Sequence, residues 1–305
     1  MKRIIITFVI GVVNICAFAQ QTPQFTQYMY NTIAVNPGYA GSREALTIVG
    51  LHRSQWVGMD GGPVTQTLSI HSPLRNERIG VGFSFINDKL GDEHNTYVYA
   101  DFSYTVNLGI ETKLAFGIKG GFSNYSIDEA LFNNPDVYND PYFQDKLNRW
   151  TPNLGAGIYL HQPKWYLGFS SPRLIENDYN KDGFYRALEQ SHFYGIAGYV
   201  FDINNSGSVK MRPTALVKMT KGAPLSVDGT LSFLFNEKLW LGASYRVDDS
   251  VGALADFQIS KQLRIGYAYD YPISDIKPYN SGTHEVFLIF DFKFDQSKYK
   301  SPRYF

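Results

Sequence analysis

The chain has 305 residues, with 28 basic and 28 acidic side chains, so its formal net charge is zero. A nucleic-acid-binding protein needs a basic surface, and this balance argues against that class of function. The 22 tyrosines, 22 phenylalanines and 27 glycines, beside a hydrophobic fraction of 44%, favour a chain of alternating β-strands over a helical protein.

The N-terminus predicts a signal peptide over residues 1–19. The charged pair Lys2-Arg3 precedes an apolar run from Ile4 to Val13, and Ala17-Phe18-Ala19 supplies a small-x-small cleavage site. The run is too short for a spanning helix, which needs about 20 apolar residues. We therefore expect export with cleavage, and a retained anchor is the alternative. The only cysteine, Cys16, lies in this segment, so the mature chain would fold without disulfides.

Residues 20–44 predict an irregular N-terminal segment. Asn36-Pro37-Gly38 and Gly41-Ser42 are turn signals. The stretch from Gln24 to Tyr30 fits either a short helix or a lid over an opening. We expect this segment to be a lid or plug for a barrel formed by residues 45–305.

From residue 45 onward, apolar residues alternate with small or polar ones, a period of two that places successive side chains on opposite faces of a strand. The pattern is clearest from Leu239 to Tyr271. It predicts about fourteen strands of roughly ten residues, the length of tilted membrane strands. The predicted strands are Ala45–Arg53, Val64–His71, Arg78–Asn87, Thr96–Val106, Lys113–Ser123, Thr151–His161, Trp165–Pro172, Ser191–Asp202, Val209–Thr220, Leu225–Phe235, Leu239–Arg246, Ser250–Ser260, Leu263–Tyr271 and Thr283–Phe294.

The connections between these strands sort into two classes, short ones after every even-numbered strand and more variable ones between. Short turns on one side and long loops on the other are typical of bacterial outer-membrane barrels, with both termini on the periplasmic side. The sequence therefore predicts an all-β, transmembrane antiparallel β-barrel in the outer membrane, and a secreted soluble all-β protein is the weaker alternative. The short connections are Ser72–Glu77, Asn107–Thr112, Gln162–Lys164, Ile203–Ser208, Asn236–Lys238 and Lys261–Gln262, and the long ones include Ser54–Pro63, Asn124–Trp150, Arg173–Gln190 and Pro272–Gly282.

Charged residues gather in the register opposite to the aliphatic and aromatic one. A charge that faces lipid near the bilayer midplane costs about 2–4 kcal/mol, so we expect these side chains to face the lumen. They either line a polar lumen that conducts solutes or binds a peptide, or form a salt-bridged network that fills the barrel. The near balance of signs favours the network. The residues are Asp101, Lys119, Lys210, Arg212, Lys218, Asp228, Arg246, Asp256, Arg264, Asp270 and Asp291.

Pro213 is a misfit within a predicted strand, because proline lacks the N–H that a ladder requires. A bulge or a strand end at this position would accommodate it.

Arg53, Gln55 and Trp56 form a candidate partner-binding group on the loop side. Tryptophan and arginine are typical anchors of protein interfaces. An interfacial tryptophan beside a snorkelling arginine fits the same residues equally well.

The sequence predicts no enzyme, no cofactor, no metal and no small-molecule substrate. The six histidines have no metal-ligand spacing, and neither a Gly-x-Ser-x-Gly motif nor a phosphate-binding glycine loop occurs. Gly117, Gly120 and Gly121 lie in a strand, where we expect them to relieve crowding on the wall. The loop Asn133–Pro141 has oxygen ligands that suit calcium but lacks the Asp-x-Asp-x-Asp-Gly spacing, so a solvated loop is favoured.

Eight blocks lie in order along the mature chain, namely Pro23–Met29, Asn36–Gly41, Arg53–Gly58, Ile86–Lys89, Lys221–Pro224, Asn236–Arg246, Gln262–Tyr271 and Ser301–Phe305. Together they resemble the PorP/SprF family of Bacteroidetes outer-membrane proteins. Gly38 stands where we would expect alanine, a small departure. The block Asn236–Arg246 is the most similar of the eight.

The resemblance implies a barrel of the type IX secretion system, linked in some members to gliding motility. It also implies a role in secreting or attaching large surface adhesins, contact with the periplasmic ring of the secretion machine, and no catalytic residues. The expected function is thus a non-enzymatic outer-membrane barrel that binds secretion components or adhesin cargo. A passive porin or small-solute channel is the alternative.

Overall fold

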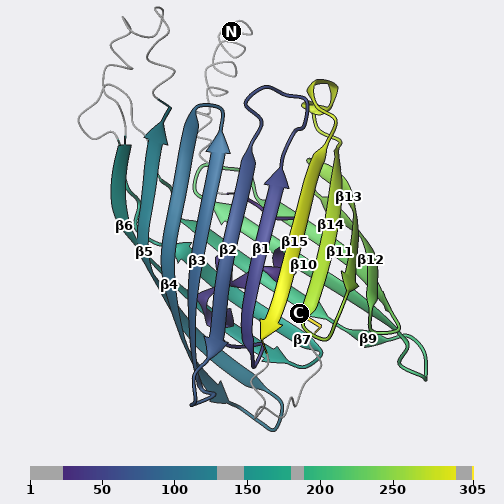
Figure 1. The fold of residues 1–305 in the computed structure, drawn as a ribbon. Helices are drawn as coiled ribbons and strands as arrows, with labels where there is room; N and C mark the ends of the chain where they lie inside the picture. The colour runs from purple at the N-terminus through teal and green to yellow at the C-terminus, as the bar shows by residue number, and fades with distance from the viewer. Residues whose placement is uncertain (1–22, 129–147, 180–188, 293–303) are drawn as a thin grey trace, which may run out of the picture.

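The computed structural model describes residues 23–128, 148–179, 189–292 and 304–305, in which one antiparallel sheet closes into a β-barrel (Figure 1). Consecutive strands pair with each other, except that β8 and the short β9 both pair with β10. β1 also pairs with β15, from Leu46 opposite Phe292 to Ser54 opposite His284. A closed barrel pairs all of its strand edges, which is the requirement for a sheet in lipid. The predicted all-β antiparallel barrel of about fourteen strands is confirmed, with one short additional strand, β9.

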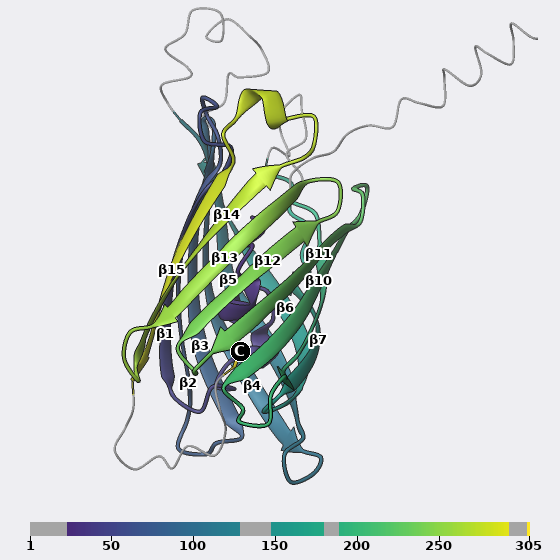
Figure 2. The same ribbon diagram turned by 90° about the vertical axis from the view of Figure 1, so that its right-hand side faces the viewer.

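The strands follow the predicted order. They are β1 (Leu46–Ser54), β2 (Val64–Pro73), β3 (Ile79–Leu90), β4 (Glu93–Asn107), β5 (Lys113–Ile127), β6 (Asn148–Gln162), β7 (Trp165–Arg173), β8 (His192–Tyr199), β9 (Phe201–Asp202), β10 (Val209–Thr220), β11 (Ser226–Phe235), β12 (Leu239–Arg246), β13 (Ser250–Gln258), β14 (Leu263–Pro272) and β15 (Thr283–Phe292). β3 and β4 are longer than predicted and meet in a tight turn at Gly91 and Asp92, because their ladder continues to Leu90 opposite Glu93. The turns after even-numbered predicted strands lie at one end of the barrel, called here the short-turn end, and the other loops lie at the long-loop end (Figures 1 and 2).

The ladder between β8 and β10 is interrupted opposite Pro213. Thr214 pairs with Gly198 on one side of the gap and Met211 with Phe201 on the other, so the register is unchanged and no bulge is present. The N–H of Val200 donates to the carbonyl oxygen of Lys164 at 2.7 Å instead. The single strand predicted over residues 191–202 is therefore divided into β8 and β9, because the proline cannot donate to the ladder.

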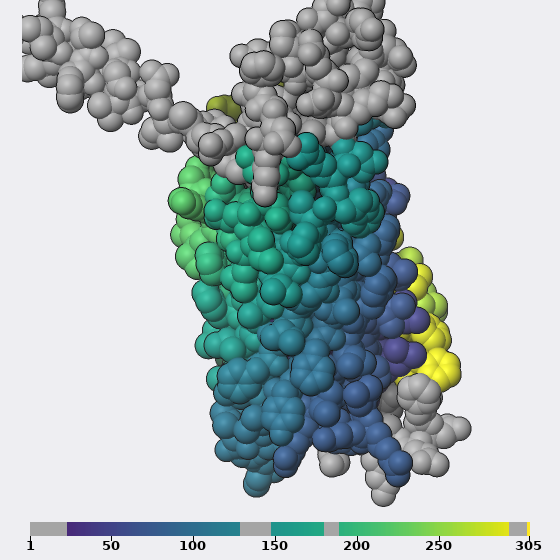
Figure 3. All heavy atoms as spheres, turned by 90° about the vertical axis from the view of Figure 1, so that its left-hand side faces the viewer, coloured from purple at the N-terminus to yellow at the C-terminus, as the bar shows by residue number. Residues whose placement is uncertain are grey.

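Side chains on the outer face of the wall are apolar and exposed, as lipid contact requires. The outer wall is continuous in the space-filling view of the β4–β6 side (Figure 3). Exposed outward residues include Phe116, Ile118, Phe122, Leu154, Ile158, Leu231, Ile265, Tyr267, Val286 and Leu288. In the part of the chain that the structure describes, no helix is long and apolar enough to cross a membrane.

The hydrophobic core lies inside the barrel, around the N-terminal segment. This segment forms three short 3-10 turns, η1 (Tyr28–Tyr30), η2 (Thr32–Ala34) and η3 (Pro37–Tyr39), and all nine residues are buried. In Figures 1 and 2 the segment is the dark purple ribbon enclosed by the strands. Apolar side chains of the segment pack against inward-facing apolar side chains of the wall, among them Val49, Leu51, Leu216, Phe287 and Ile289.

Candidate functional site

A buried cluster of charges binds the start of the N-terminal segment. Glu285 on β15 accepts the backbone N–H of Thr26 at 3.0 Å and that of Gln27 at 2.8 Å, one on each carboxylate oxygen. Arg53 on β1 lies 2.9 Å from Glu285 and 3.1 Å from Asp270, and the three side chains are at most 5% exposed. The hydroxyl of Thr26 bridges the cluster, since it accepts from Arg53 at 2.8 Å and donates to Asp270. Charge-assisted bonds of this kind are the stronger class of hydrogen bond, so the segment is firmly attached here.

Tyr30 connects the middle of the segment to a second place on the wall, on β10 and on β13, the strand beside β14. Its hydroxyl donates to Asp256 at 2.5 Å and accepts from Arg212 at 2.7 Å. The guanidinium of Arg212 stacks 4.0 Å above the ring of Trp240, and Arg264 lies 3.8 Å from Asp256. Tyr30 therefore links the segment to β10 and β13, and all the side chains around its hydroxyl are buried.

The remainder of the segment is bound through short polar side chains and backbone oxygens. Asn31 donates to Thr67 at 2.9 Å and accepts from Ser69 at 2.8 Å, both on β2. Asn36 donates to the carbonyl oxygen of Ile158 at 3.0 Å, and Ser103 donates to that of Ala40 at 2.7 Å. These contacts to β2, β4 and β6 complement those to β15 and β13, so the segment is held from several sides of the wall.

Glycines in the wall make room for this close approach. A Cβ atom at Gly117 would lie 2.1 Å from the backbone nitrogen of Gly38, and one at Gly80 would lie 2.1 Å from the carbonyl oxygen of Ala40. Any side chain at these two positions would collide with the backbone of η3 or the residue after it. The crowding that we expected at Gly117 thus comes from the N-terminal segment.

The charges predicted to face the lumen are all buried and at most 9% exposed. Lys119 pairs with Asp101 at 2.7 Å, Arg246 with Asp228 at 2.5 Å, and Asp270 joins the cluster around Arg53. Lys210 pairs with Asp202 at 2.9 Å, Asp291 pairs with Arg43 at 3.0 Å, and Lys218 is buried on β10. The structure brings Asp256, Arg264 and Arg212 together around Tyr30.

The three residues of the candidate partner-binding group are separated by the structure. The side chain of Arg53 points inward into the ion pairs with Glu285 and Asp270, so it is not available to a partner. Gln55 and Trp56 are half-buried in the loop after β1. Trp56 has a φ of 55°, a conformation that is uncommon for bulky side chains and that costs about 1–3 kcal/mol. Backbone bonds of Val57 to Gly282 and Ser281, at 2.8 and 2.7 Å, hold this loop against the β14–β15 loop.

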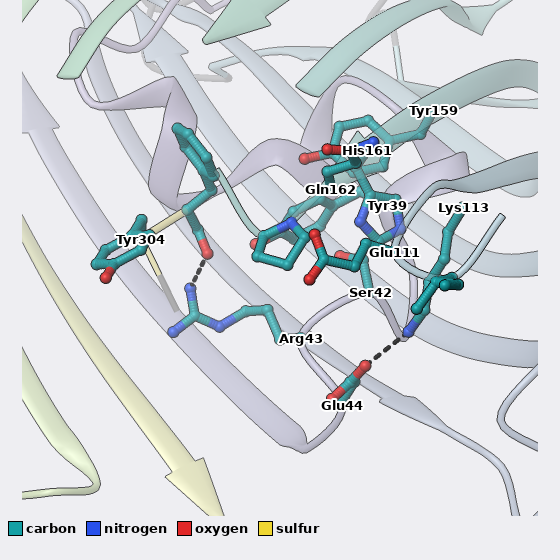
Figure 4. A pocket seen from close by; sticks show the side chains of 13 residues that line it. Tyr39, Ser42, Arg43, Glu44, Glu111, Lys113, Tyr159, His161, Gln162 and Tyr304 are labelled. Atoms are coloured by element: carbon teal, nitrogen blue, oxygen red, sulfur yellow. Dashed lines mark hydrogen bonds and ion pairs between the residues drawn. The ribbon is translucent and has the colours of Figure 1, made fainter. Parts of the chain in front are cut away.

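At the short-turn end, the residues Tyr304 and Phe305 return to the barrel mouth. Arg43 donates to the main-chain oxygen of Phe305 at 2.6 Å, and Arg212 donates to that of Tyr304 at 2.5 Å. Figure 4 shows the bond of Arg43 to the main-chain oxygen of Phe305, beside a cavity of about 150 Å³. In the turn between β6 and β7, a hydrogen bond to Asp202 raises the pKa of the Lys164 ammonium above its usual value.

The described residues contain no group of three histidine, cysteine, aspartate or glutamate side chains that would hold a metal ion. The predicted signal peptide and the loop Asn133–Pro141 lie outside the described residues.

Sequence reasoning missed Glu285, Tyr30 and the terminal pair Tyr304-Phe305. A signal for Glu285 was present, because it shares the inward register of its strand with Asp291. Tyr30 lies in an irregular stretch and the terminal pair lies beyond the last strand, so neither carries a periodic pattern that assigns it to the interior.

Comparison with protein families matches the chain to the type IX secretion system membrane protein PorP/SprF, over residues 17–290. No curated protein matches the chain.

Among solved structures, the CymD monoaromatic hydrocarbon channel is similar in fold, with a TM-score of 0.51 and 9% identity over 91% of this chain and 95% of that one. The outer membrane protein Omp33 of Acinetobacter baumannii gives a TM-score of 0.47 and 10% identity, over 82% of this chain and 100% of that one. At such identities the likeness to CymD concerns the fold alone.

Proposed function

This chain belongs to the PorP/SprF family of type IX secretion system membrane proteins, and we propose that it is a barrel that binds components of that system or adhesin cargo. In this proposal it acts in protein secretion or in the attachment of adhesins to the cell surface, contributes to gliding motility, and performs no catalysis. Export by the predicted signal peptide of residues 1–19 would deliver it to the outer membrane. The short-turn end would then face the periplasm.

The observation that carries the proposal is the filled interior. The N-terminal segment is bound to Glu285 and Asp256 on one part of the wall and to Thr67, Ser69 and Ser103 elsewhere. Inward-facing Leu216, Phe287 and Ile289 are buried against it, although a water-filled channel would have a polar interior. A plug that is part of the hydrophobic core favours a binding protein over a conduit for solutes.

The binding surfaces in this proposal are the two ends of the barrel. At the long-loop end, the loop of Gln55 and Trp56 is held in a strained conformation by the β14–β15 loop. Strained backbone clusters at functional sites, and tryptophan is enriched among interface anchors. We therefore assign Gln55 and Trp56 to the partner surface and leave Arg53 as a residue that holds the plug.

Crosslinking in the native outer membrane, followed by mild-detergent affinity purification and mass spectrometry, tests this proposal. We expect type IX secretion components or adhesin cargo to be enriched with the barrel. A Trp56→Ala variant should recover less of the partner. Tyr279→Ala, which changes an exposed aromatic of another long loop, tests whether the loss is specific to Trp56. Recovery of the barrel alone, with secretion components in the unbound fraction, would contradict the proposal.

A passive porin is the second candidate, and the many charged side chains of the interior favour it. Planar-bilayer recording distinguishes the two. A plugged barrel gives no steady conductance, whereas a porin conducts continuously.

A further inference from the structure

The mouth at the short-turn end contains a site that is filled by the chain's own residues Tyr304 and Phe305. Two buried arginines reach the main-chain oxygens of this pair: Arg43 at 2.6 Å from Phe305 and Arg212 at 2.5 Å from Tyr304. Arg43 is 6% exposed and Arg212 is 1% exposed. The site thus binds two successive backbone oxygens with charged donors in a place that water hardly reaches.

The main-chain oxygens of Tyr304 and Phe305 are hydrogen-bond acceptors for the two buried arginines. The other terminal nitrogen of Arg43 is bound by Asp291 at 3.0 Å, and that of Arg212 by the hydroxyl of Tyr30 at 2.7 Å. The Nε atom of each arginine is buried with no hydrogen-bond partner among the described residues. Buried donors without acceptors are costly, so loss of the terminal pair would leave the guanidinium groups further unsatisfied. Arg43 of the N-terminal segment and Arg212 of the wall therefore form a site that holds a peptide backbone.

The aromatic rings of Tyr304 and Phe305 each contact a side chain that favours an aromatic partner. The ring of Phe305 meets that of Tyr166 edge-on, with centroids 4.6 Å apart, and the ammonium of Lys210 lies 5.6 Å from the centre of the Tyr304 ring. At Gly198 a Cβ atom would come within 2.5 Å of the Tyr166 ring and 3.1 Å of the Phe305 ring, so the absent side chain leaves space for this ring pair. Edge-on ring pairs and cations over ring faces are both favourable, and both select aromatic side chains.

The site extends beyond the terminal pair. The adjoining cavity of about 150 Å³ is lined by Ser42, Glu111, His161 and Gln162 as well as by Arg43 and Phe305 (Figure 4). It opens among the turns of the short-turn end, since Glu111 and Pro163 belong to two of those turns. A peptide bound at the arginines therefore has room for a neighbouring polar group.

We propose that this mouth is a binding site for a peptide segment with two successive aromatic residues, and that Tyr304-Phe305 occupies it in cis. A second peptide with the same chemistry binds only by displacing the tethered pair, whose effective concentration is on the order of millimolar. Arg212 also binds Tyr30, and Arg43 belongs to the N-terminal segment, so an exchange at this site acts on that segment directly. The inference does not depend on the role in secretion proposed above.

Fluorescence anisotropy with the purified barrel in detergent tests the site. The probe is a labelled pentapeptide with the sequence of residues 301–305, and the control peptide carries alanine in place of its tyrosine and phenylalanine. We compare the intact chain with a chain that ends at residue 303. The truncated chain should bind the probe at least tenfold more tightly than the intact chain, and neither should bind the control peptide.

The full-length variant with Tyr304→Ala and Phe305→Ala repeats the test if truncation impairs folding, and heat-modifiable migration on a gel verifies that each barrel is folded. Addition of Arg212→Lys to the truncated chain should weaken probe binding, because lysine cannot donate to the oxygen of Tyr304 and to Tyr30 with the same planar geometry. Equal binding by intact and truncated chains, binding of the control peptide, or no binding to any folded variant would overturn the proposal. A failure to recover secretion components in the crosslinking experiment would leave this result unaffected.

Discussion

Arg53 and Glu285 form a buried ion pair at 2.9 Å, between the first and last strands of the barrel, and this pair also binds the N-terminal segment. Its position is significant because β1 and β15 are the strands whose pairing closes the sheet. The same carboxylate therefore connects barrel closure to the attachment of Thr26 and Gln27.

Replacement Glu285→Gln should destabilise the barrel. The change removes the charge that Arg53 faces and the second oxygen that accepts a backbone N–H, and breaking a buried pair in this way typically costs about 3–5 kcal/mol. Asp270 remains near Arg53 and reduces the loss. Urea unfolding followed by tryptophan fluorescence measures the effect. The matched control is Glu77→Gln in the exposed β2–β3 turn, and an equal effect of the two changes would contradict the assigned role of Glu285.

Replacement Gly117→Ala should displace the N-terminal segment. The new Cβ atom would lie 2.1 Å from the nitrogen of Gly38, and overpacking of this kind costs about 1–3 kcal/mol. Limited proteolysis should cut the chain between residues 23 and 44 faster than in the unchanged protein. Gly229→Ala is the control, because a Cβ atom there meets nothing within 4 Å. Proteolysis at the unchanged rate in Gly117→Ala would show that the close approach is not required.

The strands were predictable because they follow from a period of two, which is visible in any half-apolar strand, and the same period indicates which charges share one register. The inward direction of Arg53 could not be predicted, because both registers of β1 contain apolar residues. Val49 and Leu51 share the register of Arg53, while Ile48 and Gly50 lie in the other one. The inward apolar side chains are explained by the N-terminal segment, which packs against them inside the barrel. That contact joins residues far apart in the chain, and no local pattern reports it.

Lys119 and Asp101 should show strong energetic coupling. Their side chains are at most 1% exposed and 2.7 Å apart, so Lys119→Met alone leaves a buried carboxylate near Ser84 without its cation. We expect a loss of about 3–5 kcal/mol for this single change and a much smaller loss for Lys119→Met combined with Asp101→Leu. A double-mutant cycle in urea measures the coupling energy. Additive effects of the two single changes would contradict a direct ion pair in the interior.

Removal of the N-terminal segment should convert the barrel into a channel. With residues 23–40 deleted, the contacts to Glu285, Asp256 and Thr67 are lost and the charged interior is left to water. Planar-bilayer recording should then detect steady conductance that the intact chain lacks. Because the deletion also exposes apolar wall residues, heat-modifiable migration must first establish that the barrel is folded. The variant with Glu285→Gln and Asp256→Asn keeps the segment but weakens its attachment at two places, and brief openings are expected from it. If the intact chain and the folded deletion variant conduct equally, the segment is not the barrier to solutes, and the porin interpretation is favoured.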